Sequence, residues 1–311
     1  MFDILVLGEL NADLILRGDV VPEWNQTEKL IDDAALTLGS SSAIFACGAA
    51  RLGLRVAFVG VVGDDLLGRF CREALDARGV DTSGVVIDPA LRTGMTVILQ
   101  LPDDRAMLTF PGAIPMLRAE LVDPALLQVA RHIHVGSYFW QKALQPGLPA
   151  LFAQARARGA STSLDTQWDP SGEWAGLDAV LAATDILLPN EAEACALAGL
   201  AGWRPALEAL AGRVATVAVK RGASGAAAMR GAAFAEAAAP VVQVVDAVGA
   251  GDSFDAGFVY GALVGWPIER SLALAVACGA RSTRAAGGTT AQPDLEEALA
   301  VVATAIAAAQ G

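Results

Sequence analysis

Cysteine and histidine are scarce in this sequence, which limits the metal and redox chemistry available to the chain. The two histidines are His132 and His134, and no two of the four cysteines form a CxxC pair (Cys47, Cys71, Cys195 and Cys278). A zinc site needs several such ligands at close spacing. We therefore expect no zinc site, and we expect reduced, mostly buried thiols as in a cytoplasmic protein.

Basic residues are also few. The chain has 22 Lys and Arg residues against 34 Asp and Glu residues, which gives a net charge of −12. This charge disfavours binding to nucleic acid or to an anionic membrane surface. No apolar run reaches the roughly 18–20 residues of a membrane-spanning helix, and the start, MFDILVLGEL, lacks the basic region of a signal peptide. We expect a cytoplasmic protein that binds neither nucleic acid nor membranes.

Strand-like and helical segments alternate after residue 120, within a chain of 311 residues that is 54% hydrophobic. This alternation predicts an α/β fold with a mostly parallel central sheet covered by helices. No internal repeat or linker interrupts the pattern, so residues 1–311 are expected to form a single domain. The strand-like segments are 132–136, 161–164, 186–188 and 214–219, and the helical ones are 148–158, 177–182 and 191–198.

The stretch from residue 241 to 263 carries the strongest chemical signal. The apolar run 241–245 predicts a buried strand, and Gly249-Ala250-Gly251 then leads into a helical pattern. A glycine-rich turn before a helix leaves several backbone N–H groups unpaired at the positive end of the helix dipole. Such a turn can bind a phosphate or a developing oxyanion. Asp252 follows directly, and a helix cap is the alternative role for it.

The segment DAVGAGDSFDAGF closely resembles the C-terminal signature of the PfkB, or ribokinase-like, carbohydrate kinases. The resemblance implies transfer of the γ-phosphoryl group of ATP to a hydroxyl of a sugar or sugar derivative. It also implies a three-layer ribokinase-like sandwich with a small β-sheet lid. By position, Asp252 is the catalytic base, and the amides of Gly249, Ala250 and Gly251 form the anion hole. Asp255 is expected to be a helix-face residue.

Kinases of other folds do not fit the pattern. The Walker motif GxxxxGK[ST] is absent, and so is the set of protein-kinase loops.

The resemblance extends to the N-terminal residues. The family motif G-x-x-N-x-D matches Gly8 to Asp13, which implies that Asp13, and less strongly Asn11, binds sugar hydroxyls. Turn chemistry is the alternative for this pair. Lid strands are expected within 12–37 and 91–113, where they would close over the sugar and exclude water.

Arg105 and the following Pro-Gly-Ala resemble the lid return R-x-x-x-x-x-G-A, although a solvated turn residue is the alternative. Members of the family are often dimers joined through the lid, so a homodimer of this kind is also implied.

Two segments depart from the family pattern. Where the family has G-G-x-x-x-N-x-A, this chain has Gly39 and Ser40, with Ile44 or Phe45 in the place of the Asn. The change removes an amide and leaves hydroxyls and apolar surface. Because such groups choose the acceptor, the pattern does not identify the sugar.

The second departure follows Asp165. Family members often have D-x-N-x-R here, but Gln167 and Trp168 take those places. Asp165 is a candidate contact to the substrate or to the phosphate network, with a cap or turn role as the alternative. Trp168 and Trp174 are expected in the core.

The nucleotide side is implied by three further matches. Asn190 and Glu193 fit the N-x-x-E motif, which organises Mg²⁺ largely through water, although the same pair is also a capping box. Residues 220–225 resemble the nucleotide loop K-x-G-x-x-G, and 278–288 resemble the wall of the adenine pocket. The implied nucleotide-binding residues are Lys220, Gly222, Gly225 and Gly279, and Asp246 is a candidate for a monovalent cation site such as K⁺.

Two other functions fit parts of the pattern. A nucleoside kinase of the same family would use the apolar position at Ile44 or Phe45, together with Phe110, to hold a base. A non-catalytic sugar or nucleotide sensor would keep the fold. The intact Gly-Ala-Gly-Asp signature argues against the sensor, because a sensor does not need the base.

Overall fold

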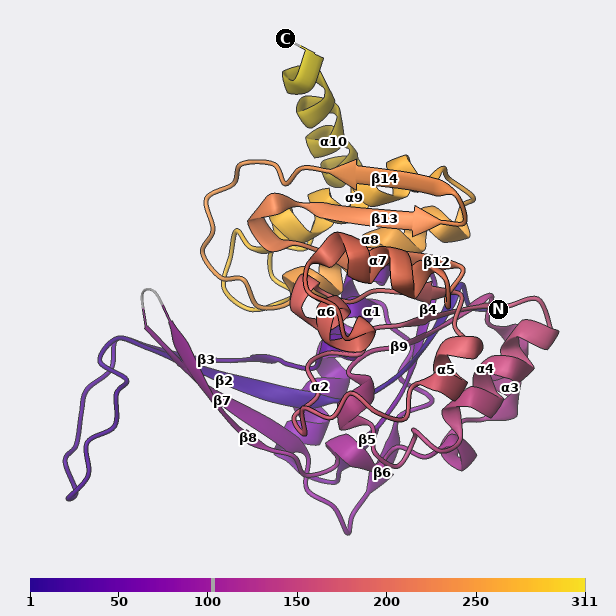
Figure 1. Cartoon of the computed structure of the whole chain (residues 1–311). Coiled ribbons are helices and arrows are strands. Elements are labelled where there is room, and N and C mark those ends of the chain that lie inside the picture. The colour runs from indigo at the N-terminus through magenta and orange to yellow at the C-terminus, as the bar shows by residue number, and fades with distance from the viewer. Residues whose placement is uncertain (102–103, 311) are drawn as a thin grey trace.

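A large sheet runs through the centre of the chain, whose computed structural model describes residues 1–101 and 104–310 (Figure 1). Its strand order is β14-β13-β12-β11-β10-β9-β1-β4, and all pairs are parallel except those at the β12–β13–β14 edge. The prediction of a mostly parallel α/β sheet is confirmed. The strands are β1 (Ile4–Leu7), β4 (Val56–Val59), β9 (His132–Val135), β10 (Ser161–Leu164), β11 (Ile186–Leu187), β12 (Thr216–Lys220), β13 (Ala226–Arg230) and β14 (Ala233–Ala237).

Helices cover both faces of this sheet because its strands are apolar on both sides. In β1, Ile4 and Val6 pack into one hydrophobic cluster while Leu5 and Leu7 pack into the other, as expected for a buried parallel strand. The first cluster is closed by α1 (Ser41–Arg51), α2 (Leu66–Asp76), α8 (Ala250–Leu263), α9 (Ile268–Ser282) and α10 (Leu295–Gln310). The second is closed by α3 (Pro124–Val129), α4 (Leu148–Ala157), α5 (Asp178–Ala182), α6 (Glu191–Ala198) and α7 (Trp203–Ala211).

A second, four-stranded sheet stands beside the main body (Figure 1). Its order is β3 (Asp33–Leu38), β2 (Asn11–Arg17), β7 (Gly94–Gln100) and β8 (Arg105–Phe110). The loop 18–32 extends away from it, and a short pair, β5 (Val61–Gly63) with β6 (Val86–Asp88), lies near its base. Since β2 begins four residues after β1 ends, the small sheet stands at the carboxyl edge of the large one.

The prediction of a buried strand at 241–245 is wrong. Val241, Val244 and Val245 are exposed, and the segment forms a loop between β14 and α8. Its neighbour along the chain, β14, is already the edge strand of the large sheet, and the loop leaves that edge to reach α8. The N–H groups of Val245 and Asp246 instead donate to the Thr283 carbonyl.

The scarce titratable residues are structural. His132 and His134 are buried and hydrogen-bonded to Ser161 and Ser163, and burial lowers the pKa of His132 to about 3. All four cysteines are free thiols, and three of them are buried. Within the described ranges, no helix has both the length and the apolar character needed to cross a bilayer.

Candidate active site

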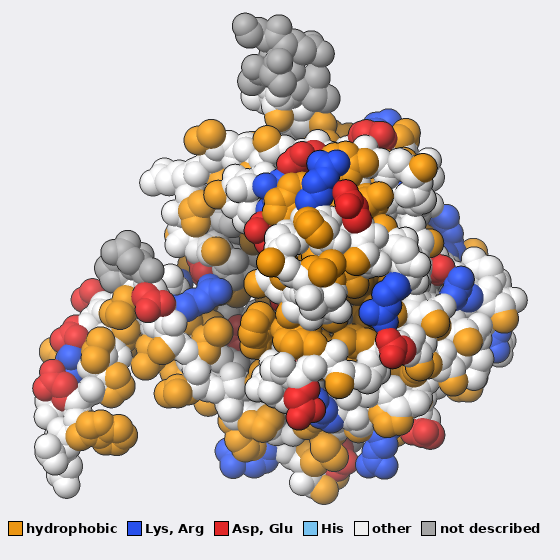
Figure 2. Space-filling model, viewed as in Figure 1, with side chains coloured by type: hydrophobic (Ala, Val, Ile, Leu, Met, Phe, Trp, Pro, Cys, Tyr) orange, Lys and Arg blue, Asp and Glu red, His pale blue; other side chains and the backbone are white. Residues whose placement is uncertain are grey.

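A cavity of about 660 Å³ lies between the two sheets, at the carboxyl ends of the large sheet's strands. This is the position at which open parallel sheets bind ligands. Figure 2 shows that the surface is hollowed between the small sheet and the main body. The groups that follow the strand ends and face the cavity are Glu9 after β1, Asp165 after β10, Asn190 after β11, and Lys220 at the end of β12.

The small sheet turns its polar face toward this cavity. Asp13, Thr96 and Thr109 lie in register across β2, β7 and β8, and all three line the cavity. Ile98 and Met107 follow two residues further along the same face. Side chains of the opposite face alternate with these and are apolar, because successive strand residues point to opposite sides.

Asp252 lies in the first turn of α8, where the sequence predicted the base. Its side chain is 6% exposed and lines the cavity. The helix begins after Gly249, whose φ of 74° suits glycine, and a Cβ on that residue would lie 2.7 Å from the Cα of Gly288. Glycine is thus needed here both for the turn and for the close packing.

The amides before Asp252 are only partly free. Ala250 donates its N–H to the Ala247 carbonyl at 3.3 Å. The N–H groups of Gly249, Gly251 and Asp252 have no acceptor in the described part of the chain. Free N–H groups at the start of a 14-residue helix form a site suited to an anion.

Burial raises the pKa of Asp252 to about 8, and the charges of Asp165 and Glu9 add to the rise, while Lys220 opposes it. A carboxyl group with such a pKa can take up a proton near neutral pH, as a general base must.

Lys220 forms ion pairs with two carboxyl groups, those of Asp165 and Asp255. Its Nζ lies 2.9 Å from Asp165 and 3.1 Å from Asp255; both carboxyl side chains are buried, and the lysine side chain is 12% exposed. Asp255, predicted as a helix-face residue, is 1% exposed and faces Lys220. The signal for it was present in the sequence: it lies three residues after Asp252 in an otherwise apolar helix, and therefore on the same side.

The protonation of this cluster follows from its charges. Lys220 holds the pKa of Asp165 below its usual range against the cost of burial, whereas burial raises the pKa of Asp255 well above it. Asp165, Asp252 and Asp255 offer oxygens within 4.8 Å of one another. The ammonium of Lys220 already compensates two of these carboxyl groups.

Asn11 and Asp13, which are predicted to bind the acceptor, line the same cavity. Asn11 donates to Asp13 at 3.1 Å, and burial, reinforced by Glu9, raises the pKa of Asp13 to about 7. Gly39 makes room for this pair, since a Cβ there would collide with the Asp13 carboxylate. Ser40 lines the cavity but also caps α1 by accepting the Ala43 N–H.

Arg105 lines the same cavity from β8, with its side chain exposed. It lies four residues along the strand from Thr109, which is about 13 Å at the rise of an extended chain.

Glu9 was missed by the sequence reasoning. It is buried and accepts hydrogen bonds from Ser42, Ser137 and Gln141. Its place directly after β1 was the one available signal. Because its oxygens are held by these donors, Glu9 fixes the cavity wall.

The residues that depart from the family pattern are brought together. Gln167 donates through Nε2 to the Ser41 Oγ at 2.5 Å, and both line the cavity. Ile44 lines it as well, whereas Phe45 is buried and stacks on His134. The residues that depart from the family pattern and line the cavity therefore form one part of its wall.

The two tryptophans lie in different environments. Trp174 packs against the core as predicted, but Trp168 is 54% exposed and lines the cavity, so a core position for it is wrong. It follows Gln167, whose φ of 54° turns the chain toward the cavity.

Asn190 and Glu193 form a capping box at the start of α6 and also line the cavity. Glu193 is buried, and burial together with the charge of Asp165 raises its pKa to about 7. Asn190 and Glu193 thus cap the helix and line the cavity at the same time.

The expected nucleotide residues are spread more widely. Gly222 lines the cavity, but Gly225 does not; its φ is 86°, and a Cβ there would collide with the Ala237 carbonyl. Gly279 packs against the backbone of Ala250, where a Cβ would lie 3.0 Å from the carbonyl oxygen. Asp246 holds two loops by accepting the N–H groups of Val248 and Gly287. Close packing therefore accounts for the two glycines Gly225 and Gly279.

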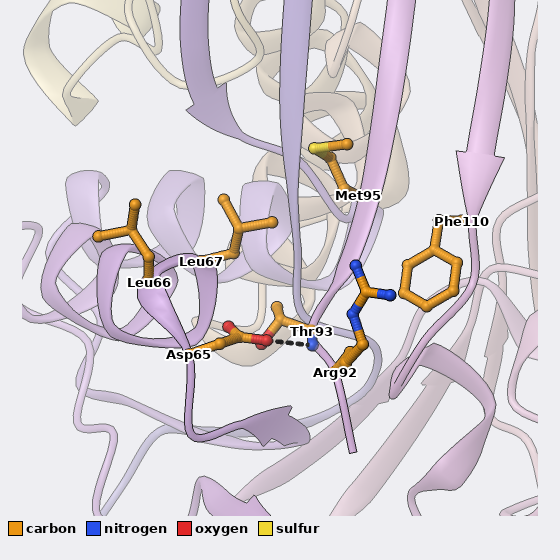
Figure 3. A pocket seen from close by; sticks show the side chains of 7 residues that line it. All are labelled: Asp65, Leu66, Leu67, Arg92, Thr93, Met95 and Phe110. Atoms are coloured by element: carbon orange, nitrogen blue, oxygen red, sulfur yellow. Dashed lines mark hydrogen bonds between the residues drawn. The ribbon is translucent and has the colours of Figure 1, made fainter. Parts of the chain in front are cut away.

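A separate pocket of about 290 Å³ lies between α2 and the small sheet (Figure 3). Phe110 lines it, with the Arg92 guanidinium 4.9 Å from the ring centroid. Figure 3 also shows the hydrogen bond from the Thr93 N–H to Asp65. Phe110 therefore stands outside the larger cavity and is not placed to hold a base there.

Comparison with known proteins identifies the family. The model of the pfkB family carbohydrate kinases matches residues 1–295. The chain is 32% identical to an ATP-dependent ribose-1-phosphate kinase of Halopiger xanaduensis, across 94% of this chain and 95% of that protein. It is 34% identical to a fructokinase of Klebsiella pneumoniae, across 95% and 99%.

Solved structures share the fold. A ribokinase II of E. coli in complex with ATP and Mg²⁺ superposes with a TM-score of 0.87 at 24% identity, covering 98% of this chain and all of that one. The ribokinase-like fold is thereby confirmed. The chain belongs to the pfkB family of carbohydrate kinases, phosphotransferases that use an alcohol group as acceptor.

Proposed function

We propose that the protein is an ATP-dependent kinase that transfers the γ-phosphoryl group to a hydroxyl of a sugar or sugar derivative. One observation carries the proposal: Asp252, buried and with a raised pKa, lines the same cavity as the start of α8, with its free amides, and the polar face of the small sheet. An acceptor held by Asp13 would lie on one side of the base, and the phosphates on the other.

In this reaction Asp252 takes the proton of the acceptor hydroxyl. The hydroxyl oxygen forms a bond to the γ-phosphorus, the bond from phosphorus to the β–γ bridging oxygen breaks, and ADP leaves with that electron pair. The proton then passes from Asp252 to solvent. Phosphoryl transfer depends on positioning and charge stabilisation, and the free N–H groups of Gly249 and Gly251 supply part of the latter.

The residues on the phosphate side fit a magnesium ion. Mg²⁺ prefers oxygen ligands, keeps several waters and uses one or two carboxylates, and Glu193 and Asn190 present such oxygens at the cavity. When bound, Mg²⁺ neutralises charge on the phosphates. A monovalent cation such as K⁺ is proposed beside Asp246, whose carboxylate oxygens each accept one backbone N–H and keep a further lone pair.

The direct test is ADP release from Mg·ATP with a panel of sugars, sugar acids, sugar phosphates and nucleosides. Turnover on a sugar or sugar derivative supports the proposal. Turnover on nucleosides alone would favour the nucleoside kinase, for which the apolar Ile44 side chain in the cavity wall is the supporting observation. ATP binding without turnover on any acceptor would favour a sensor.

Asp13→Asn is expected to raise the KM for the acceptor about 10- to 100-fold, because a hydrogen bond to a charged group contributes about 1.5–3 kcal/mol. The KM for ATP should stay near the wild-type value, since Asp13 lies in β2 of the small sheet, whereas the free amides lie at the start of α8. Steady-state kinetics with each substrate varied separately measures both. Asp33→Asn, at the exposed far end of the same sheet, is the control. An equal rise in both KM values would contradict the assignment.

We also propose that two copies join through the outer face of the small sheet. That face carries Leu14, Leu36 and Leu108, and Leu108 is 63% exposed. In Figure 2 hydrophobic side chains are exposed over the small sheet and near the end of the loop that extends from it. Exposed apolar patches of this kind mark protein interfaces.

Leu108→Asp is therefore expected to convert a dimer to a monomer in analytical ultracentrifugation, because a buried unpaired carboxylate opposes association. Leu200→Asp, at an exposed leucine in the α6–α7 connection, should leave the dimer intact. A wild-type protein that sediments as a monomer would contradict the dimer.

A further inference from the structure

Ser41 stands between the two segments that depart from the family pattern. It is the first residue of α1, after Ser40 has capped the helix with a φ of 70°. Its Oγ accepts the Nε2–H of Gln167 at 2.5 Å. Ser41, Gln167 and Asp252 all line the same cavity. An Oγ that accepts from Gln167 keeps its own proton free to donate.

Gln167 is held in place by Asp165. Its backbone N–H donates to Asp165 at 2.9 Å, which fixes the left-handed turn at φ 54°. The other oxygen of Asp165 accepts Lys220 at 2.9 Å. A continuous chain of contacts thus runs from Lys220 through Asp165 and Gln167 to Ser41.

The remaining step of this chain is Asp252. Ser41 and Asp252 line the same cavity, and the Ser41 hydroxyl is among the influences that lower the pKa of Asp252, against burial, which raises it. The direction agrees with the chemistry of the pair, because an ionised carboxylate only accepts hydrogen bonds and the hydroxyl can therefore act on it only as a donor.

We propose that Ser41, oriented by Gln167, is a positioning residue that donates a hydrogen bond to the carboxylate of Asp252 and keeps it ready to accept the acceptor proton. This inference rests on the proposed function, in which Asp252 is the base. It assigns a task to two residues that the family signature does not account for. The residues of the cavity wall that depart from the family pattern thereby adjust the proton affinity of Asp252.

Other charged groups also face Asp252, and the test must separate them from Ser41. They are Glu9 after β1, Asp165 after β10, Lys220 at the end of β12, and Asp255 on the same helix, with Glu193 of α6 beside the Asp165–Lys220 pair. All of them stay in place when Ser41 is replaced by alanine, so a shift of the pH profile in that variant reports the hydroxyl.

Ser41→Ala is expected to raise the pKa on the acid side of the kcat/KM profile by about one unit, since one hydrogen bond to a carboxylate contributes on that scale. A base with a pKa near 8 is partly deprotonated at pH 7. The variant should therefore lose about tenfold in kcat/KM at pH 7 but stay within about twofold of wild type at pH 9.5. Ser41→Thr keeps a hydroxyl and should restore the wild-type profile.

Gln167→Glu provides the second variant. A carboxylate at 167 accepts the Ser41 proton and withdraws it from Asp252, and its negative charge also opposes ionisation of Asp252, so the acid-side pKa should rise by at least as much as in Ser41→Ala. Thr109→Val removes a cavity hydroxyl on β8 that is hydrogen-bonded to Thr96. It should leave the acid-side pKa where it is, whatever its effect on KM.

A loss in Ser41→Ala that is the same at every pH, or a rise confined to the acceptor KM, would overturn the proposal and make Ser41 a substrate contact. An unchanged profile in both Ser41→Ala and Gln167→Glu would overturn it as well. These outcomes differ from failure of the proposed function, which would appear as full activity of Asp252→Asn across the same pH range.

Discussion

Asp252→Asn is expected to lower kcat by about 10³-fold or more, because general base catalysis contributes roughly 10²–10⁴-fold and asparagine cannot accept the proton. The amide has the same shape as the carboxylic acid, so the start of α8 should persist and the Kd for ATP should change little. Rapid-quench kinetics and calorimetric titration with the nucleotide measure the two effects. Asp64→Asn, at an exposed aspartate, is the control. A variant that keeps full turnover would remove Asp252 from its role.

The same substitution should stabilise the fold at high pH. The pKa of Asp252 is raised from an ordinary value of 3.8 to about 8, chiefly by burial. Between these values the unfolded chain is ionised while the folded protein remains protonated, so the wild-type free energy of unfolding falls as pH rises from about 4 to 8. Asparagine does not ionise, so the variant lacks this pH-dependent loss of stability. Urea unfolding should therefore show a gain on the order of a few kcal/mol at pH 9 and little gain below pH 4.

Local signals were enough to predict the glycine-rich turn and the helix that carries Asp252 into the cavity. The glycine-rich turn before Asp252 has an unusual backbone conformation and close packing that only small residues satisfy, so this turn can be recognised from the amino-acid sequence alone. The alternation of apolar segments likewise predicted the parallel sheet. The run 241–245 misled because local hydrophobicity cannot report whether a neighbouring strand is available for pairing.

Contacts between distant segments could not be predicted in this way. Lys220 and Asp255 are 35 residues apart, and Ser41 and Gln167 are 126 apart. Each side chain taken alone reads as a cap, a turn or a solvated group. Only the parallel sheet, which brings the ends of β10 and β12 to one edge beside α1 and α8, gives these residues a shared environment.

The largest effect on stability is expected from Lys220→Met. The ammonium compensates Asp165 and Asp255, whose side chains are buried, and the lysine side chain is itself only 12% exposed. Removing one member of a buried ionic group costs about 3–5 kcal/mol, because the remaining charge is left without a partner. We expect a loss of this size in the free energy of unfolding at pH 8, measured by urea denaturation. Lys142→Met, at an exposed lysine, should change it by less than about 0.5 kcal/mol.

The pH dependence of this loss distinguishes charge from packing. In the wild type, Lys220 keeps the pKa of Asp165 low, so Asp165 stays ionised. Without the ammonium, burial must raise that pKa, and the folded variant gains stability by binding a proton as pH falls toward 4. The difference between wild type and Lys220→Met should therefore shrink between pH 8 and pH 5. A difference that is constant over this range would instead mean that the lysine contributes through the packing of its alkyl chain.

A double variant completes this test. Asp255→Asn removes one of the two carboxyl groups that Lys220 contacts, so Lys220→Met/Asp255→Asn should recover part of the stability lost in Lys220→Met. Because the three groups touch, their effects are coupled, and the coupling free energy from the cycle should exceed about 1 kcal/mol. Simple additivity would show that Lys220 and Asp255 act independently. The carboxylates around the base would then have to be compensated by some other group, and a buried Asp252 with a pKa near 8 would be harder to explain.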